Sequence, residues 1–326
     1  MNPVERVVAV LEGRRPDRPP YSHWRHFSAA EVYGRPAVEA HVAHLQRFDL
    51  DFLKIMNDNP YPHAAPVRSV EDLQELRPLR GDEHGFGRQL ELIADLKTVL
   101  GDQVLMICTL FNAWAVLRKL IRPTQSHGPP NLHAAQDEPS RTMHEFIAQD
   151  EPVVRGALGA IGANLANFAR RCLAAGADGV YLSVRDDWVR TPSRPGLFEE
   201  LVTPSDLRIL DAVREARFNM LHVCGRPLEL RRLSEYPVHA LHWADRAAGP
   251  SLAEAAEWAK PALCGGVDNL DTLPNGSAED CAREVRDALR QTAPRPILLA
   301  PGCTYDPDTP EANLRAMGDA ALESHA

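Results

Sequence analysis

The sequence predicts a single-domain (β/α)8 barrel of the TIM type, spanning residues 1–326 and beginning with an N-terminal helical extension. Short apolar runs alternate with longer amphipathic stretches, which is the pattern of β/α units. Eight such runs can be counted, and no repeat, linker or low-complexity tract divides the chain. Barrels of this class routinely exceed about 200 residues as one domain, so the length is acceptable.

Each expected strand is an apolar run bounded by turn residues or by the start of a helical pattern. The strands are expected at 20–24, 52–56, 104–109, 179–184, 219–223, 240–244, 262–267 and 297–300. The helices between them show apolar residues at helical spacing, and two begin with Thr-Pro pairs that favour a first helical turn. They are expected at 37–48, 87–100, 112–121, 153–175, 204–216, 228–236, 252–259, 278–291 and 310–322.

Composition narrows the functional class. Hydrophobic residues make up 44% and charged residues 25%, which are ordinary values for a globular protein. The formal charge is −9, with 36 basic against 45 acidic residues, so no basic surface for nucleic acid or an anionic membrane is indicated. No apolar run resembles a signal peptide or a membrane span, and we expect a cytoplasmic protein with reduced cysteines and a small-molecule partner. A homodimer is compatible with the sequence.

A His-x-Cys pair, His222 and Cys224, lies at the end of an expected strand, and Cys303 follows the last expected strand. Residues two apart in a strand share a face, so the pair can chelate. Buried structural roles are common for lone histidines and cysteines. The conjunction of all three beside glycines favours Zn(II) with an open fourth position, because imidazole and thiolate suit that metal.

The order of several motifs resembles the uroporphyrinogen decarboxylase superfamily, and within it the methylcobamide:thiol (coenzyme M type) methyltransferases. The similar segments are 5–8, 16–20, 51–56, 176–183, 221–225, 265–268 and 301–303. The resemblance implies zinc bound by His222, Cys224 and Cys303, and transfer of a methyl or similar alkyl group involving a zinc-activated thiol. No Asp-x-His-x-x-Gly signature of a corrinoid module is present, so a corrinoid would come on a separate protein, or the methyl group from a small methylated compound.

Two alternatives stay open. The decarboxylases of the superfamily are zinc-free and carry an Arg-rich motif after the first strand, where this chain has a single arginine, Arg25, for a carboxylate substrate. Asp58 is the nearest match to their catalytic aspartate. The other alternative is a non-catalytic barrel that binds a tetrapyrrole, a thiol or a metal.

Further polar residues lie where barrel enzymes place working groups, at the ends of strands. Asp245 is a candidate catalytic group and Asp268 a candidate substrate ligand, with helix capping or an ion pair to Arg246 as the structural alternative. Tyr181 and Ser183 share a strand face and could contribute to catalysis and substrate binding. The remaining cysteines are expected in the core or in helices.

Residues 122–152 are longer than a usual β/α connection and contain Pro129-Pro130 and many acidic side chains. They could form a lid over the barrel mouth or an ordinary surface excursion.

Overall fold

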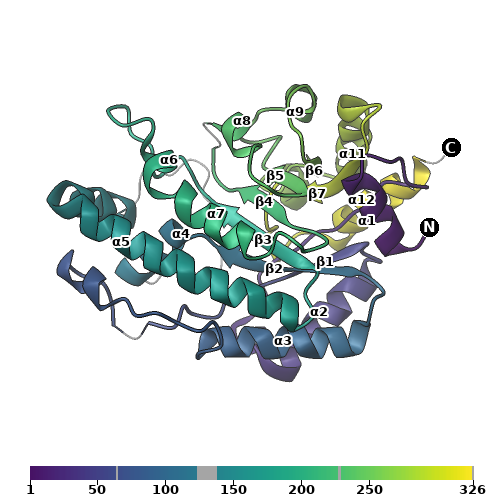
Figure 1. The fold of residues 1–326 in the computed structure, drawn as a ribbon. Helices are drawn as coiled ribbons and strands as arrows, with labels where there is room; N and C mark the ends of the chain where they lie inside the picture. The colour runs from purple at the N-terminus through teal and green to yellow at the C-terminus, as the bar shows by residue number, and fades with distance from the viewer. Residues whose placement is uncertain (64, 123–137, 227–228, 325–326) are drawn as a thin grey trace.

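The fold is seen in a computed structural model, which describes residues 1–63, 65–122, 138–226 and 229–324. Its centre is a parallel sheet of seven strands in chain order, curled so that helices cover its outer face (Figure 1). Each strand lies within two residues of its predicted bounds. The strands are β1 (Phe52–Ile55), β2 (Leu105–Phe111), β3 (Gly179–Val184), β4 (Met220–Val223), β5 (Ala240–Trp243), β6 (Ala262–Val267) and β7 (Ile297–Pro301).

The expected first strand at 20–24 is wrong as a strand, and the fold is TIM-barrel-like, with seven strands among the described residues. Only one isolated bridge, between Tyr21 and Leu299, forms there. Ser22 N–H donates to the Leu299 carbonyl at 3.0 Å, and Asp51 N–H donates to the Tyr21 carbonyl at 3.0 Å. The segment therefore joins β7 to the residue before β1, but Pro19 and Pro20 have no N–H to extend the ladder.

The helices follow the expected alternation, and α1 supplies the N-terminal extension. Asn2 caps α1, with Pro3 in its first turn. None of the helices in the described ranges is both long and apolar enough to cross a bilayer. The α-helices are α1 (Pro3–Leu11), α2 (Gly34–Arg47), α3 (Gly85–Leu100), α4 (Ala113–Ile121), α5 (Glu138–Ala174), α6 (Leu197–Leu201), α7 (Thr203–Asp211), α8 (Leu230–Leu233), α9 (Leu252–Ala256), α10 (Thr272–Asn275), α11 (Ala278–Thr292) and α12 (Glu311–Glu323).

Helix α5 begins earlier than the sequence predicts. It kinks at Asp150, whose backbone is not helical, just before Pro152. The second part matches the expected helix at 153–175, and the first part belongs to the segment considered as a lid. Residues 123–137 of that segment lie outside the described residues, so its role as a lid stays a prediction.

The interior of the curled sheet has two layers. The lower layer is apolar and contains Phe52, Leu105, Ile107, Phe218, Met220 and Leu298, all almost fully buried. Above it, nearer the carboxyl ends of the strands, the inward side chains include Lys54, Tyr181, His222 and His242. A second apolar cluster packs the outer face of the sheet against the helices. Polar groups inside the barrel therefore gather at the end where barrel enzymes bind ligands.

Asp51 holds the segment at 20–22 against β1. Its carboxylate is fully buried and accepts hydrogen bonds from the Arg18 guanidinium at 2.6 and 3.0 Å. It also accepts the Tyr21 N–H at 2.9 Å and a contact from Arg6 at 3.2 Å. A buried ion pair of this kind is costly to break, because the remaining charge has no other partner.

Asp51→Ala should lower the free energy of unfolding by about 3–5 kcal/mol, since Arg18 and the Tyr21 N–H lose their acceptor. The midpoint of urea unfolding, followed by circular dichroism, measures the change. Asp102→Ala, which removes the exposed partner of Lys97, is the control and should leave the midpoint nearly unchanged. Equal midpoints for the two variants would contradict this role of Asp51.

Candidate metal centre

The three predicted ligands meet at one rim of the sheet. His222 lies in β4, and Cys224 is the first residue after this strand. Cys303 comes two residues after β7 ends. One ligand atom from each lies within 4.8 Å of the others. Gly302 allows this approach, because a Cβ there would lie 2.7 Å from the Cα of Ala244. The glycine thus lets the chain that carries Cys303 pass close to the end of β5.

The spacing of the cluster fits a tetrahedral metal. His222 Nε2 lies 3.5 Å from Cys303 Sγ. Zinc bonds of about 2.0 Å to nitrogen and about 2.3 Å to sulfur place two tetrahedral ligands about 3.6 Å apart. His222 Nδ1 is buried and has no hydrogen-bond partner within the described part of the chain. The donor set and its spacing are therefore compatible with Zn(II).

A small cavity of about 130 Å³ adjoins the cluster. The lining combines the three candidate ligands with polar and apolar side chains from β1, β2 and β3. It consists of His26, Lys54, Met56, Asn57, Thr109, Phe111, Tyr181, Ser183, His222, Cys224, Cys303 and Thr304. The structure thus brings five predicted site residues to one cavity: Tyr181, Ser183 and the three ligands.

Two aromatic neighbours fix the His222 ring. Tyr181 stacks on it at 5.2 Å between ring centroids, and His242 lies 4.7 Å away. His242 Nε2 is 2.8 Å from the Pro301 carbonyl, which can only accept, so this nitrogen carries a proton. Burial lowers the pKa of His242 well below its usual value, so the ring is neutral and its Nδ1 accepts the Tyr181 O–H at 3.0 Å. Tyr181 and His242 therefore position His222.

The two thiols lose their protons at different pH values. The hydrogen bond with Cys224 lowers the pKa of Cys303 to about 7. The same hydrogen bond, together with burial, raises the pKa of Cys224. The first proton therefore leaves the pair near neutral pH, whereas the second is held until a cation replaces it. Metal binding would remove both protons.

Lys54 and His242 are site residues that sequence reasoning missed. Each lies on the inward face of its strand, two residues from another inward residue, Met56 and Ala240 respectively. That alternation is the signal that could have found them. In the sequence a single lysine or histidine within an apolar run has no spacing that marks it as functional.

Asp58 does not line this cavity but lines a neighbouring hollow of about 450 Å³, which shares Asn57 and Phe111 with it, and it contacts the cavity residue His26. The His26 ring nitrogen Nδ1 lies 2.9 Å from an Asp58 carboxylate oxygen. Burial opposes ionisation of Asp58, but this hydrogen bond and the charge of His26 bring the pKa of the carboxyl below its usual value. His26, which lines the cavity, is thereby oriented by the carboxylate. A catalytic role for Asp58 stays a prediction.

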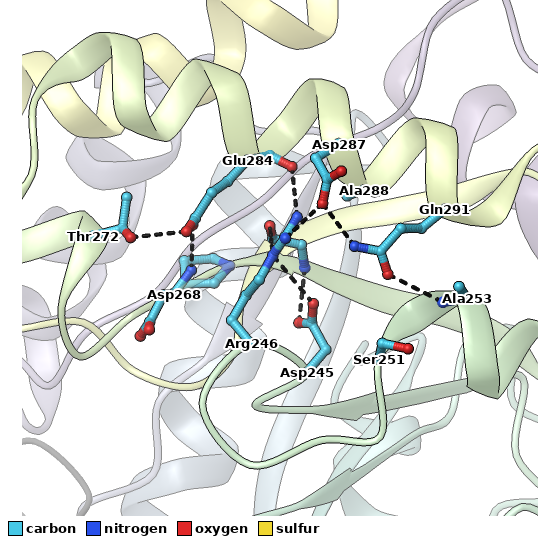
Figure 2. Close-up of polar contacts among 12 residues, drawn as sticks. Asp245, Arg246, Ser251, Ala253, Asp268, Thr272, Glu284, Asp287, Ala288 and Gln291 are labelled. Atoms are coloured by element: carbon cyan, nitrogen blue, oxygen red, sulfur yellow. Dashed lines mark hydrogen bonds and ion pairs between the residues drawn. The ribbon is translucent and has the colours of Figure 1, made fainter.

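Asp245 and Asp268 do not line the cavity: Asp245 is bonded to β6 and to Arg246, and Asp268 is bonded to α11 (Figure 2). Asp245 accepts the Gly266 N–H at 3.0 Å, and burial raises its pKa to about 7. Arg246 binds Asp287 at 2.6 Å and the Glu284 carbonyl at 2.8 Å. The Asp268 carboxylate accepts a hydrogen bond from the Leu270 N–H, and the backbone N–H of Asp268 donates to the Glu284 carboxylate. These contacts are of the capping and ion-pair kind.

Arg25 lies apart from the metal cluster. It lines a separate hollow of about 270 Å³ with Arg47 and Tyr305, and its guanidinium lies 5.7 Å from the centre of the Phe27 ring. The structure therefore does not bring Arg25 into the cavity beside Cys303, and its role in substrate binding stays a prediction.

The model of the uroporphyrinogen decarboxylase (URO-D) family matches residues 48–324, which include every strand of the sheet and all three candidate ligands. The chain belongs to the URO-D family. Among curated proteins, none matches this URO-D chain.

Solved structures support the fold of this URO-D protein. A methyltransferase from Methanosarcina mazei superposes with a TM-score of 0.76 at 16% identity, covering 100% of both chains. A B12-independent methionine synthase from a Shewanella species gives a TM-score of 0.48 at 11% identity, covering 72% of this chain and 66% of that one. The likeness to the methyltransferase, at 16% identity, shows the fold alone, and the TM-score of the second structure is too low to support an argument.

In the metal-free URO-D protein, iodoacetamide should modify Cys303 before any other described cysteine, because the alkylated species is the thiolate. The thiolate fraction grows as pH rises, so the rate should reach half its plateau near pH 7, where the pKa of Cys303 lies. Peptide mass spectrometry locates the label. Burial raises the pKa of Cys281 to about 12, and this residue serves as the internal control. Faster labelling of Cys281 or Cys224 would contradict the assignment.

Proposed function

We propose that this URO-D family member is a zinc-dependent methyl- or alkyltransferase that activates a thiol substrate. The observation that carries the proposal is the His222, Cys224 and Cys303 cluster opening onto a cavity. Three protein ligands and an adjoining space are typical of a catalytic rather than a structural zinc site. The large apolar core makes a purely structural metal unnecessary for folding.

Zinc at these ligands would supply a Lewis acid that keeps a coordinated thiol deprotonated and nucleophilic at neutral pH. The chain's own residues do the rest. Tyr181 and His242 hold the His222 ring in place, and Met56 and Phe111 give the cavity apolar walls that limit water. The substrate thiol loses its proton to solvent. A sulfur lone pair then forms the bond to the alkyl carbon, and the electrons of the broken bond stay with the donor.

The size of the cavity favours a small substrate. Pockets for drug-sized ligands measure about 300–1,000 Å³, whereas this one measures about 130 Å³. A small thiol fits such a volume, and a neighbouring hollow of about 450 Å³ that shares Asn57 and Phe111 with the cavity offers space for the rest of a substrate or for the donor. The alkyl donor is then either a methylated corrinoid carried by a separate protein or a small methylated compound. The fold shared with the Methanosarcina methyltransferase supports this reading.

The decarboxylase alternative has weaker support from the geometry. It would rely on Asp58, which is paired with His26, and on Arg25, which lies in another hollow. A carboxylate-rich tetrapyrrole would meet few cations in the cavity itself, where Lys54 is the one lysine or arginine among the described lining residues. A non-catalytic thiol- or metal-binding barrel would show the same ligands without turnover.

The purified protein should contain about one zinc per chain, and Cys224→Ser combined with Cys303→Ser should abolish zinc binding. Cys281→Ser, which changes a thiol outside the cluster, is the matched control and should keep the metal. Because protons compete for His222 and both thiolates, zinc should be released as pH falls below about 6. Metal analysis by mass spectrometry measures all three. Full zinc in the double variant would contradict the ligand assignment.

Removing zinc with a chelator at neutral pH should abolish activity and leave the far-ultraviolet circular dichroism spectrum unchanged, because the core folds independently of the metal. A global loss of helical signal would show that the metal is structural.

Incubation with methylcobalamin and a panel of small thiols should yield the methylated thiol. The absorbance change of the cobalamin measures the rate. Cys303→Ser should lower kcat/KM at least about 100-fold, since an essential metal ligand is lost. The control is again Cys281→Ser, which should keep its rate. Failure with every thiol, together with release of CO2 from uroporphyrinogen, would establish the decarboxylase instead.

A further inference from the structure

Lys54 is a buried cation at the cavity for which the proposed chemistry has so far given no role. It lies in the middle of β1 on the inward face and is 5% exposed. Its ammonium lies 3.1 Å from the Met56 sulfur and 4.4 Å from the centre of the Tyr181 ring. Within the described residues it forms no ion pair with a carboxylate. The ammonium therefore lies at the cavity with only weak acceptors.

Such an arrangement is unfavourable unless an anion compensates for it. Removing an ammonium from water costs several kcal/mol, and the contacts with an aromatic face and a thioether return little of this. Burial lowers the pKa of Lys54 to about 8, although the negative charges of Cys303 and Asp58 oppose the shift. At neutral pH the group is thus still mostly charged. In the metal-free protein the thiolate of Cys303 is the nearest negative charge, and a metal bound there would neutralise it, so the ammonium can then be balanced by a ligand that brings a negative charge.

The loaded metal centre would not supply that charge by itself. A divalent cation bound to two thiolates and a neutral imidazole has no net charge. When the sulfur of a substrate thiol joins as a thiolate, one negative charge is added beside the cavity. The ammonium of Lys54 is then the group that balances it.

Resting on the proposed function, we propose that Lys54 binds the negative charge of the substrate sulfur rather than a charged group on the substrate's tail. Its ammonium and the Cys303 thiol line the same cavity of about 130 Å³, so a sulfur beside the cluster lies in the field of Lys54. A thiol bound here would lose its S–H proton to water, and its sulfur would take the open position of the metal held by His222, Cys224 and Cys303. Alkylation turns the sulfur into a neutral thioether, so the attraction ends and the product is free to leave.

The test compares Lys54→Met with Lys260→Met in the zinc-loaded protein. Methionine keeps the approximate length of the side chain without its charge, and Lys260 is exposed and paired with Glu235, so both variants lose the same net charge. Calorimetric titration uses 2-mercaptoethanol, which has a neutral tail, 3-mercaptopropionate, which has an anionic tail, and the thioether 2-(methylthio)ethanol. Zinc content and circular dichroism establish that each variant is folded and loaded.

Lys54→Met should lower the affinity for both thiols by a similar factor of about 10 to 100. It should leave the affinity for the thioether unchanged, because only the thiolates carry charge at sulfur. Lys260→Met should bind all three like the wild type. A lower affinity for 3-mercaptopropionate alone would overturn the inference and show that Lys54 binds the carboxylate of the substrate's tail. Loss of zinc from Lys54→Met would overturn it in favour of a role in metal binding. Equal affinities in all proteins would also overturn it.

The proposed function fails in a different way. If the zinc-loaded wild type binds 2-mercaptoethanol and Lys54→Met does not differ from it, only the inference about Lys54 is lost. If the wild type holds zinc and binds neither thiol, thiol activation itself is contradicted, and the inference falls with it.

Discussion

Parallel pairing of the strands is the constraint on which the rest of the structure depends. Because all seven strands run the same way, their carboxyl ends meet at one rim, and residues separated by dozens of positions become neighbours. The register places Ser183, His222 and His242 side by side across β3, β4 and β5. Cys303 reaches the same place from the end of β7. Sheet geometry, more than any local motif, assembles the cluster.

The layering of the interior gives this rim its electrostatic character. Phe52, Met220 and Leu298 fill the lower layer and exclude water from beneath the cavity. Charges next to such a buried apolar layer interact more strongly than they would in water. The pKa values of Cys303, His242 and Lys54 all depart from their ordinary values, and burial or a close neighbour accounts for each.

Sequence reasoning recovered the features that depend on local pattern and missed those that depend on contacts across strands. Apolar runs located seven strands, and the His-x-Cys spacing located the cluster. Two prolines reduced the expected strand at 20–24 to one bridge. Asp245 lies two residues after β5, but its carboxylate accepts the Gly266 N–H, a contact that the sequence does not reveal. Lys54 was missed because one lysine in an apolar run carries no pattern of its own.

The chain of contacts from Tyr181 through His242 to the Pro301 carbonyl joins β3, β5 and β7 directly beneath the ligands. These contacts hold three strands at fixed separations before any ion binds. The entropy cost of ordering the site therefore arises during folding and not on metal binding. A site of such fixed span discriminates among ions by radius and preferred geometry. Metal choice in this protein would then be a property of the barrel wall as much as of the three ligand side chains.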